Sequence, residues 1–378
     1  MNKKYLFLPL IIVLVYIISC SKDDNEEPYI PIPTSPVVVD LTQVPYPKLS
    51  DYNFFEGELK NQNPALDVLP YEPSSALFSD YAHKKRFVWM PKNTKATFNG
   101  DENSLELPVG SAIIKTFYYD NVQNTTPVGA SVIVETRIMI RKNEGWIFAE
   151  YVWNEDQTEA YFDLHGSYKT INWIDENNTN KTVDYRIPNE VQCITCHKSE
   201  KIVNSQLVTT NIPIALKPQN LNFNYNYSDG AKNQLLKWIE KDYLENNFSL
   251  PSSQNTVINY SDASKPINLR ARAYLDINCA HCHSENGHCG YRPMRFAYSE
   301  SYNNNTNLGV CVDTQDMQDF PSFLSKIVAP GRIDKSMLYY RLNTTDESYR
   351  MPLHGRTLIH EEGLLIMEEW INSLQPCQ

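Results

Sequence analysis

The sequence predicts a multidomain β + α chain, with an N-terminal antiparallel β sandwich or barrel followed by an α-helical region. Between residues 49 and 186, stretches rich in β-branched and aromatic residues are typical of strands. Residues 141–146 carry the Asn and Gly expected of a hairpin turn. From residue 187 on, apolar residues recur at helical spacing instead.

The strands are expected at residues 86–90, 111–119, 131–141 and 146–153. Helices are expected at 232–243, 269–276 and 361–374. The last of these places four apolar side chains on one face and acidic residues in its first turn, where they suit the helix dipole: Leu364, Met367, Ile371 and Leu374.

The N-terminus predicts export. Two lysines precede an apolar run over residues 5–18, which is short for a membrane span and typical of a signal peptide, here 1–19. Residues 17–20 fit a lipobox, so we expect lipidation of Cys20; an ordinary signal peptide that contains a cysteine is the alternative. Residues 20–48 form an acidic, Pro-rich tether. We therefore expect an outer membrane lipoprotein on the periplasmic face or the cell surface.

The composition limits the partners. The formal net charge is −11, and removal of Lys3 and Lys4 with the signal peptide makes it −13. This acidic balance argues against nucleic acid as a partner. The chain that remains is long enough for more than one domain, and we expect a β domain at 49–186 followed by segments at 187–260 and 261–378.

The pattern Cys-x-x-Cys-His occurs twice, at residues 193–197 and 279–283. It is the attachment sequence for a c-type haem, in which two thiols form thioethers with the vinyl groups and the histidine ligates the iron. We therefore expect two covalently bound c-type haems, one in each of the two C-terminal segments, which makes the α-helical region a dihaem cytochrome c-like region. The thioether residues are Cys193, Cys196, Cys279 and Cys282, and the iron ligands are His197 and His283.

Zinc is the main alternative. A four-cysteine zinc site built from both pairs is conceivable, but Cys279 lies 83 positions after Cys196, far beyond zinc-ribbon spacing. Neither zinc ribbons nor redox dithiols require the histidine that follows the second cysteine in both copies.

The sixth ligand of the second haem is expected to be Met351, which lies on a Pro-stiffened loop 68 residues after His283 and just before the last helix. Its rivals are Met294, Met337 and His354, and the alternative is a core methionine.

The first haem has no evident sixth ligand, because no Met or His follows His197 before the second motif. The candidates are a residue of the second haem domain or one from the β domain: His83, Met90, Met139 and His165. A five-coordinate iron is the remaining possibility.

Three cysteines stay outside the motifs and the lipobox. In an oxidising compartment two of them should pair, and the Cys289–Cys311 disulfide closes the shortest loop. The alternatives are that Cys377 is a partner or that all three are free.

Several segments resemble one family of exported dihaem c-type cytochromes, largely uncharacterised and often encoded beside parallel β-helix proteins. They are residues 77–81, 151–158, 187–189, 270–278 and 328–331, and the resemblance extends from about residue 50 to the end. The acidic residues after Cys20 resemble those of Bacteroidota lipoproteins. The resemblance implies electron transfer and two haems, and it supplies no substrate.

The expected function is that of a membrane-anchored dihaem cytochrome carrying electrons between a redox partner protein, such as a dehydrogenase, and the respiratory chain. We expect an electron-transfer protein more than a catalyst, and no residue is assigned a catalytic role. The alternative is a dihaem peroxidase or oxidase with the first haem as reactive site; in a third interpretation the β domain is a docking module.

Overall fold

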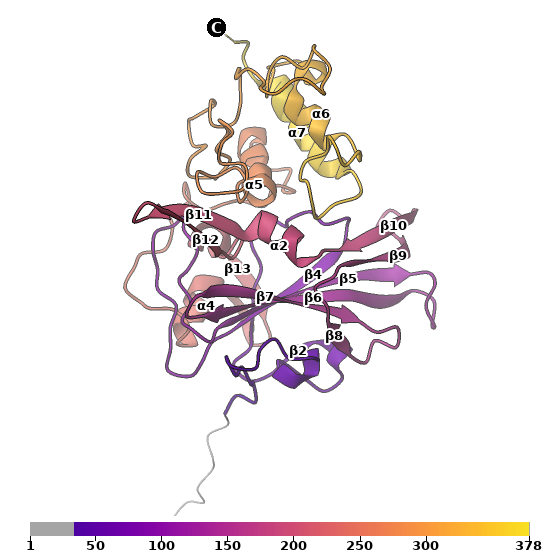
Figure 1. Ribbon diagram of the computed structural model, residues 1–378, viewed down its shortest axis with the longest axis vertical. Coiled ribbons are helices and arrows are strands. Elements are labelled where there is room, and N and C mark those ends of the chain that lie inside the picture. Colours follow the sequence, from indigo (N-terminus) through magenta and orange to yellow (C-terminus); the bar gives the residue numbers. More distant parts are fainter. Residues whose placement is uncertain (1–33, 378) are drawn as a thin grey trace, which may run out of the picture. The chain divides into compact units, whose positions relative to one another are not determined.

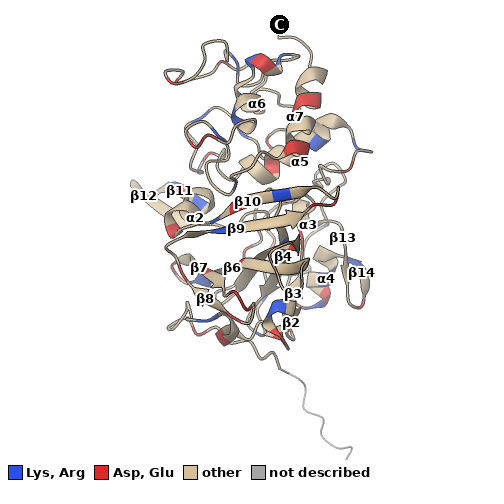
Figure 2. Cartoon of the chain, turned by 90° about the vertical axis from the view of Figure 1, so that its right-hand side faces the viewer, with Lys and Arg blue, Asp and Glu red and all other residues tan. Residues whose placement is uncertain are grey.

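The computed structural model describes residues 34–377. The predicted signal peptide and the lipidated Cys20 lie outside these residues, as does the first part of the tether. From Pro36 on, the chain forms one compact unit. No helix in the described range is long and apolar enough to cross a membrane. Charged residues of both signs are interspersed along this part of the chain (Figure 2).

One eight-stranded antiparallel sheet dominates the unit (Figure 1). Its order is β10-β9-β5-β6-β7-β8, and β4 joins β5 while β3 pairs with β4. The strands are β3 (Leu69–Pro70), β4 (His83–Trp89), β5 (Ala112–Val122), β6 (Ala130–Lys142), β7 (Gly145–Trp153), β8 (Ala160–Phe162), β9 (Ser167–Ile174) and β10 (Asn180–Ile187). The order does not close on itself, so the sheet is open where a sandwich or barrel was expected.

The predicted α-helical cytochrome region is wrong. Strands hold 28% and helices only 18% of the residues that the structure describes. After residue 187 the chain adds two hairpins, β11 (Lys198–Val203) with β12 (Gln206–Asn211) and β13 (Asn224–Tyr227) with β14 (Gly230–Asn233). Positive φ at Asn204 and Ser205 suits the tight turn of the first hairpin, and β-branched residues fill its strands. The apolar residues at helical spacing occur in short segments. These segments form short helices and not a continuous helical domain.

These helices are α2 (Glu190–His197), α3 (Pro218–Leu221), α4 (Gln234–Glu240), α5 (Ile267–Cys279), α6 (Met337–Leu342) and α7 (Glu361–Ser373). Short 3₁₀ turns and strands complete the described chain: η1 (Leu49–Tyr52), β1 (Phe55–Glu56), η2 (Leu59–Asn61), β2 (Asn63–Pro64) and η3 (Ile333–Lys335). Between α5 and η3 the chain is mostly turns, in a stretch rich in Asn, Ser and Gly.

Three cores position the site. On one face of the sheet, the N-terminal segment packs through buried aromatics, among them Tyr52, whose hydroxyl accepts from Tyr151 at 2.8 Å. On the other face, α4 buries Trp238 completely. A third core joins α5 to α7, where Trp370 is fully buried. Because α2 lies between the sheet and α5 (Figure 1), the first motif is enclosed by both.

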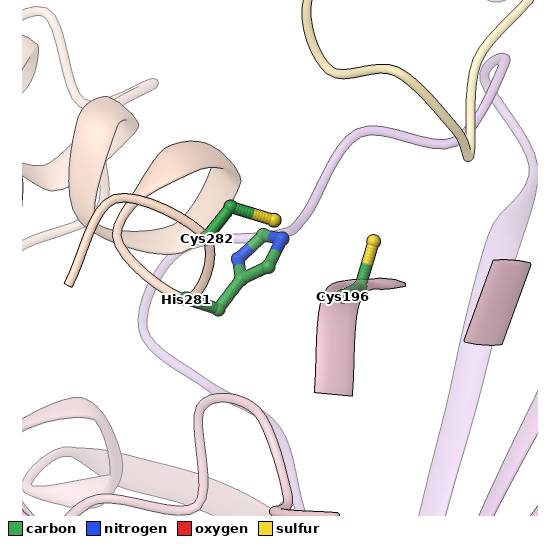
Figure 3. Close-up of side chains that lie close together, drawn as sticks. All are labelled: Cys196, His281 and Cys282. Carbon is green, nitrogen blue, oxygen red and sulfur yellow. The ribbon is translucent and has the colours of Figure 1, made fainter. Parts of the chain in front are cut away.

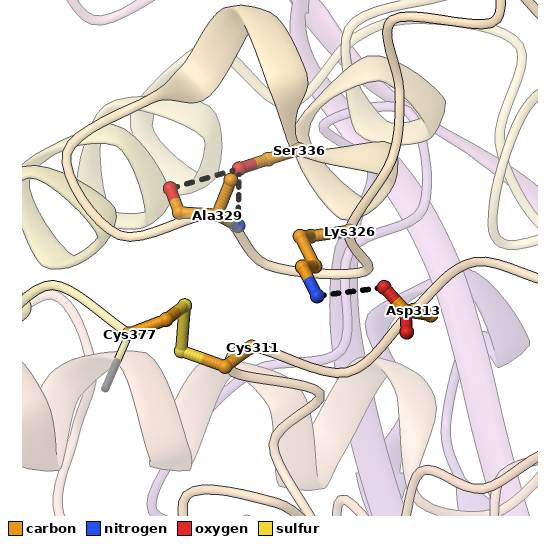
Figure 4. The surroundings of a disulfide bond; sticks show 6 residues. All are labelled: Cys311, Asp313, Lys326, Ala329, Ser336 and Cys377. Carbon is orange, nitrogen blue, oxygen red and sulfur yellow. Dashed lines mark hydrogen bonds and ion pairs between the residues drawn. A yellow bond between two sulfur atoms is a disulfide. The ribbon is translucent and has the colours of Figure 1, made fainter.

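The predicted Cys289–Cys311 disulfide is wrong, because Cys311 pairs with Cys377, with Cα atoms 5.7 Å apart (Figure 4). The chain after α7 returns to the turn that carries Cys311. Cys289 is buried and free, and its backbone N–H donates to the oxygen of Cys282 at 2.9 Å. This bond fixes Cys289 against the second motif, and the shortest-loop criterion could not include that constraint.

We expect the Cys377→Ala variant to lose about 4 kcal/mol of unfolding free energy, because the disulfide closes a long loop, with a sequence separation of 66. Urea unfolding of the two proteins without reductant measures the loss. Alkylation of the unfolded wild-type protein without reductant is the companion measurement: label is expected on Cys289. Label on Cys311 would contradict the pairing.

Candidate functional site

The first motif forms the helix α2, which Asn189 begins. The Asn189 side chain accepts from the Gln192 N–H, and the Gln192 side chain accepts in return from the Asn189 N–H. Residues three and four apart share a helix face, so Cys193, Cys196 and His197 are presented together. The three residues lie within one helical turn, which is the arrangement that attachment of a c-type haem requires.

The second motif begins where α5 ends. Cys279 is the last residue of α5. The His283 N–H donates to the Cys279 oxygen at 3.0 Å, which adds one further turn. His283 is buried, with its ring 5.2 Å from that of Phe296. Both motifs therefore lie at the C-terminal end of a helix, the first within α2 and the second after α5.

The two motifs meet. Side-chain ligand atoms of Cys196, His281 and Cys282 all lie within 4.8 Å of one another (Figure 3), although α2 and the turn after α5 are far apart in the sequence. The Cys282 thiol donates to the oxygen of Thr195 at 3.7 Å. This contact could not be predicted from the sequence, because it depends on how α5 packs over the sheet.

His197 is oriented for ligation. Its Nδ1 lies 2.8 Å from the carbonyl oxygen of Ile212, and because a carbonyl only accepts, Nδ1 carries the proton and Nε2 is free. Burial lowers the pKa of His197 to about 4, with the hydrogen bond to Ile212 opposing this shift. The imidazole is therefore neutral at pH 7, as a metal ligand must be.

A cavity opens beside the first motif. It holds about 1680 Å³ of space not filled by atoms, part of it open to solvent, between the sheet, α2, α5 and residues 352–360. Cys193, Cys196 and His197 line it together with apolar side chains such as Phe148, whose ring lies 5.3 Å from that of His197. Two thiols, a neutral imidazole and apolar walls are the set of groups that a covalently bound haem needs, so these residues fit one.

The second motif also borders empty space. His283 and Met351 both line two adjoining cavities, of which the larger holds about 1120 Å³ including solvent. Burial lowers the pKa of His283 to about 4, so this imidazole is neutral too. Met294 and Met337 line the larger cavity, and His354 lines the smaller. The structure thus brings Met351 and its three rivals to the same space, and ligation by Met351 stays a prediction.

The β-domain candidates for the first haem separate by position. His83 and His165 are exposed, and Met90 is buried in the core under α4. Met139 alone of the four lines the first cavity.

Two histidines near the C-terminus, His354 and His360, line the first cavity too. As ligands of the first haem they were covered only by the general expectation of a residue from the second haem domain. His360 is occupied: it stacks on Phe78 at 4.2 Å, and its Nδ1 lies 3.3 Å from the Tyr274 hydroxyl. His354 is less constrained, because its Nδ1 is buried without a hydrogen-bond partner in the described range. His354 lines the cavities of both motifs.

Asp80, which lies shortly before β4, binds the segment that follows His354 through hydrogen bonds. Its carboxylate accepts from the backbone N–H groups of Thr357 and Leu358 at 2.7 and 2.8 Å, and its own carbonyl accepts from Tyr119. Burial raises the pKa of Asp80, and these hydrogen bonds oppose the shift. The clamp joins residues 278 positions apart and closes one wall of the first cavity.

A carboxyl pair lies on the sheet, and one of its members, Glu150, lines the same cavity. Arg137 is placed between Glu135 and Glu150, with its Nε 3.3 Å from the Glu150 Oε2, and the Tyr185 hydroxyl donates to Glu135. Burial, followed by the negative charge of Glu135, raises the pKa of Glu150 well above its ordinary value. Burial opposes the shift of Glu135, but Arg137 keeps its pKa lowered. Both shifts favour a proton on Glu150 over one on Glu135.

We expect Glu150→Gln to stabilise the protein at alkaline pH. A carboxyl with a raised folded-state pKa contributes its full stability below the unfolded value of about 4.5 and loses it as pH rises. The neutral amide removes this loss. The free energy of unfolding of the variant should therefore exceed that of the wild type by about 1 kcal/mol at pH 8, and it should fall less steeply as the pH rises. Urea unfolding at pH 5 and pH 8 measures it, with the exposed Glu144→Gln as control. A variant less stable than wild type at pH 8 would contradict the proton on Glu150.

Comparison with protein-family models, curated proteins and solved structures finds no match for this chain. The resemblance to exported dihaem cytochromes therefore stays a hypothesis, and the function has to be argued from the residues of the site.

Proposed function

We propose that this protein is a dihaem c-type cytochrome whose function is electron transfer. The observation that carries the proposal is the pair of Cys-x-x-Cys-His turns, each with a neutral histidine and each bordering a cavity. His197, with Nδ1 held by Ile212 and Nε2 free, has the arrangement of a metal-ligating imidazole.

A metal ion held by Cys196, His281 and Cys282 explains less. That group offers three ligands where structural zinc takes four, and neither Cys193 nor Cys279 belongs to it. It also gives no role to the large cavity beside α2. Haem attachment uses all four cysteines and both motif histidines, and it excludes the ion, because a thioether sulfur is no longer a thiolate.

In this proposal His197 and His283 are the axial ligands supplied by the motifs, and Met351 is the sixth ligand at the second motif. A bound c-type haem supplies a one-electron iron couple, and thioether ligation favours its reduced form. Contact between Cys196 and Cys282 supports transfer between the two centres, because it brings the two attachment points together.

We further propose that Cys20 carries a lipid anchor and that the cytochrome exchanges electrons with a partner protein, such as a dehydrogenase, at the outer membrane. The acidic charge, −13 once the signal peptide with Lys3 and Lys4 is removed, favours a partner with a basic docking surface.

One observation favours the alternative function, a peroxidase or oxidase. Arg137 and Glu150 line the first cavity, and the raised pKa of Glu150 keeps a proton available there for acid–base chemistry. Turnover of peroxide with a reduced donor, lost in Glu150→Gln, would assign catalysis to the first haem.

A spectroscopic redox titration of the purified holoprotein tests the proposal. Two one-electron transitions are expected, with no consumption of peroxide. A protein without a reversible visible-region transition would contradict electron transfer.

A further inference from the structure

A row of charged side chains crosses the sheet at the first cavity. Arg86 on β4 is the direct cross-strand partner of Lys115 on β5, and Lys115 is the partner of Arg137 on β6. Glu150 on β7 continues the row as the partner of Arg137. Directly opposed residues point to the same face, so three cations lie side by side.

The neighbouring row on this face is apolar. It consists of the residues two positions along each strand: Val88, Ile113, Met139 and Phe148. These side chains belong to or pack against the core under α4. The charged row therefore borders the core on one side, and the next row on its other side carries Lys84 and Glu135.

The cations exceed the anions that could balance them. Like charges in directly opposed positions destabilise a sheet. Arg137 has Glu135 and Glu150 as its ion-pair partners. Within the described chain, the side chains of Arg86 and Lys115 make no ion pair, although Arg86 is only 9% exposed. Burial lowers the pKa of both. A negatively charged occupant would balance these two buried side chains.

The row faces the first motif. Arg86, Lys115 and Arg137 line the same cavity as Cys193 and Cys196. We propose that this row is a carboxylate-binding site and that it receives the propionates of the first haem. The inference rests on the proposed function. Haem attached through its vinyl groups presents its two propionates from the other two pyrrole rings, which are the only carboxylates such a group brings into this cavity.

The test compares midpoint potentials of the purified holoproteins. Lys115→Met and Arg86→Met remove a positive charge at nearly constant side-chain volume. They should shift the potential of the first haem downward, because an unbalanced propionate favours the ferric state, and leave the second haem unchanged. Lys115→Arg should restore the wild-type value. Lys85→Met is the matched control: it lies next to Arg86 on the other face of β4, where its Nζ donates to the Asn61 oxygen at 3.3 Å.

The outcomes separate the two claims. Two haems per chain with unchanged potentials in Lys115→Met and Arg86→Met would overturn the inference and leave the dihaem proposal standing. If Arg86→Met fails to fold, Lys115→Met and Lys115→Arg decide alone. Acetate or nitrite that shifts the wild-type haem spectrum, but not that of Lys115→Met, would assign the row to a dissolved anion and overturn the propionate assignment. Absence of haem from the wild type would refute the dihaem proposal itself.

Discussion

A chain in which Cys193 and Cys196 are both replaced by serine is expected to carry one haem, and so is a chain with Cys279→Ser and Cys282→Ser. Each motif supplies both thioethers for its own haem, so loss of one pair should leave the other attached. Intact-mass measurement of the denatured proteins counts the haems, because thioethers survive denaturation.

Cys289→Ser is the control for this pair of variants. Cys289 is a free, buried cysteine beside the second motif, and it should be dispensable for attachment. Loss of both haems from either double variant, with the fold retained, would show that the motifs form one shared site. The Cys196–Cys282 contact would then be a joint metal site and the attachment model would be wrong.

The second large effect is expected at Met351. Met351→Ala should lower the midpoint potential of the second haem by on the order of 100 mV, because loss of a thioether ligand removes its preference for ferrous iron. The optical spectrum should change from low-spin to high-spin character at that haem alone. Potentiometric titration followed by visible absorption measures both.

Met294→Ala and Met337→Ala are matched controls, since both methionines line the same cavity as His283. Either should leave the potential nearly unchanged. His354→Ala tests the remaining alternative, in which His354 and not Met351 is the sixth ligand of the second haem. If Met351→Ala keeps the wild-type spectrum while His354→Ala becomes high-spin at the second haem, the sixth ligand is His354.

The sequence located local features well. The strand expected at 131–141 is β6, Ala130–Lys142, because β-branched residues and a hairpin turn at its end are read within a few positions. The helices predicted at 269–276 and 361–374 are α5 and α7, because the apolar spacing that predicts a helix is also read within a few positions. Both motifs are recognisable because their chemistry depends on spacing within one turn.

Features that depend on distant pairing were not predictable. The open sheet follows from which strand joins β5, and the Cys311–Cys377 disulfide follows from the path after α7. The charged row exists only through the register of β4, β5 and β6, because Arg86, Lys115 and Arg137 lie far apart in the sequence. The hairpin β11–β12 was missed because its strands are short and largely exposed, so they lack the alternation of a half-buried strand.

The number of haems per chain tests the central claim most directly. The full-length protein, produced in a host that matures c-type cytochromes, is measured by pyridine haemochrome absorbance against protein concentration and by intact mass, with metal analysis of the same sample. Two covalently bound haems and no stoichiometric zinc are expected. A chain without covalent haem, carrying one zinc that is lost in the Cys196→Ser and Cys282→Ser variants, would contradict the account.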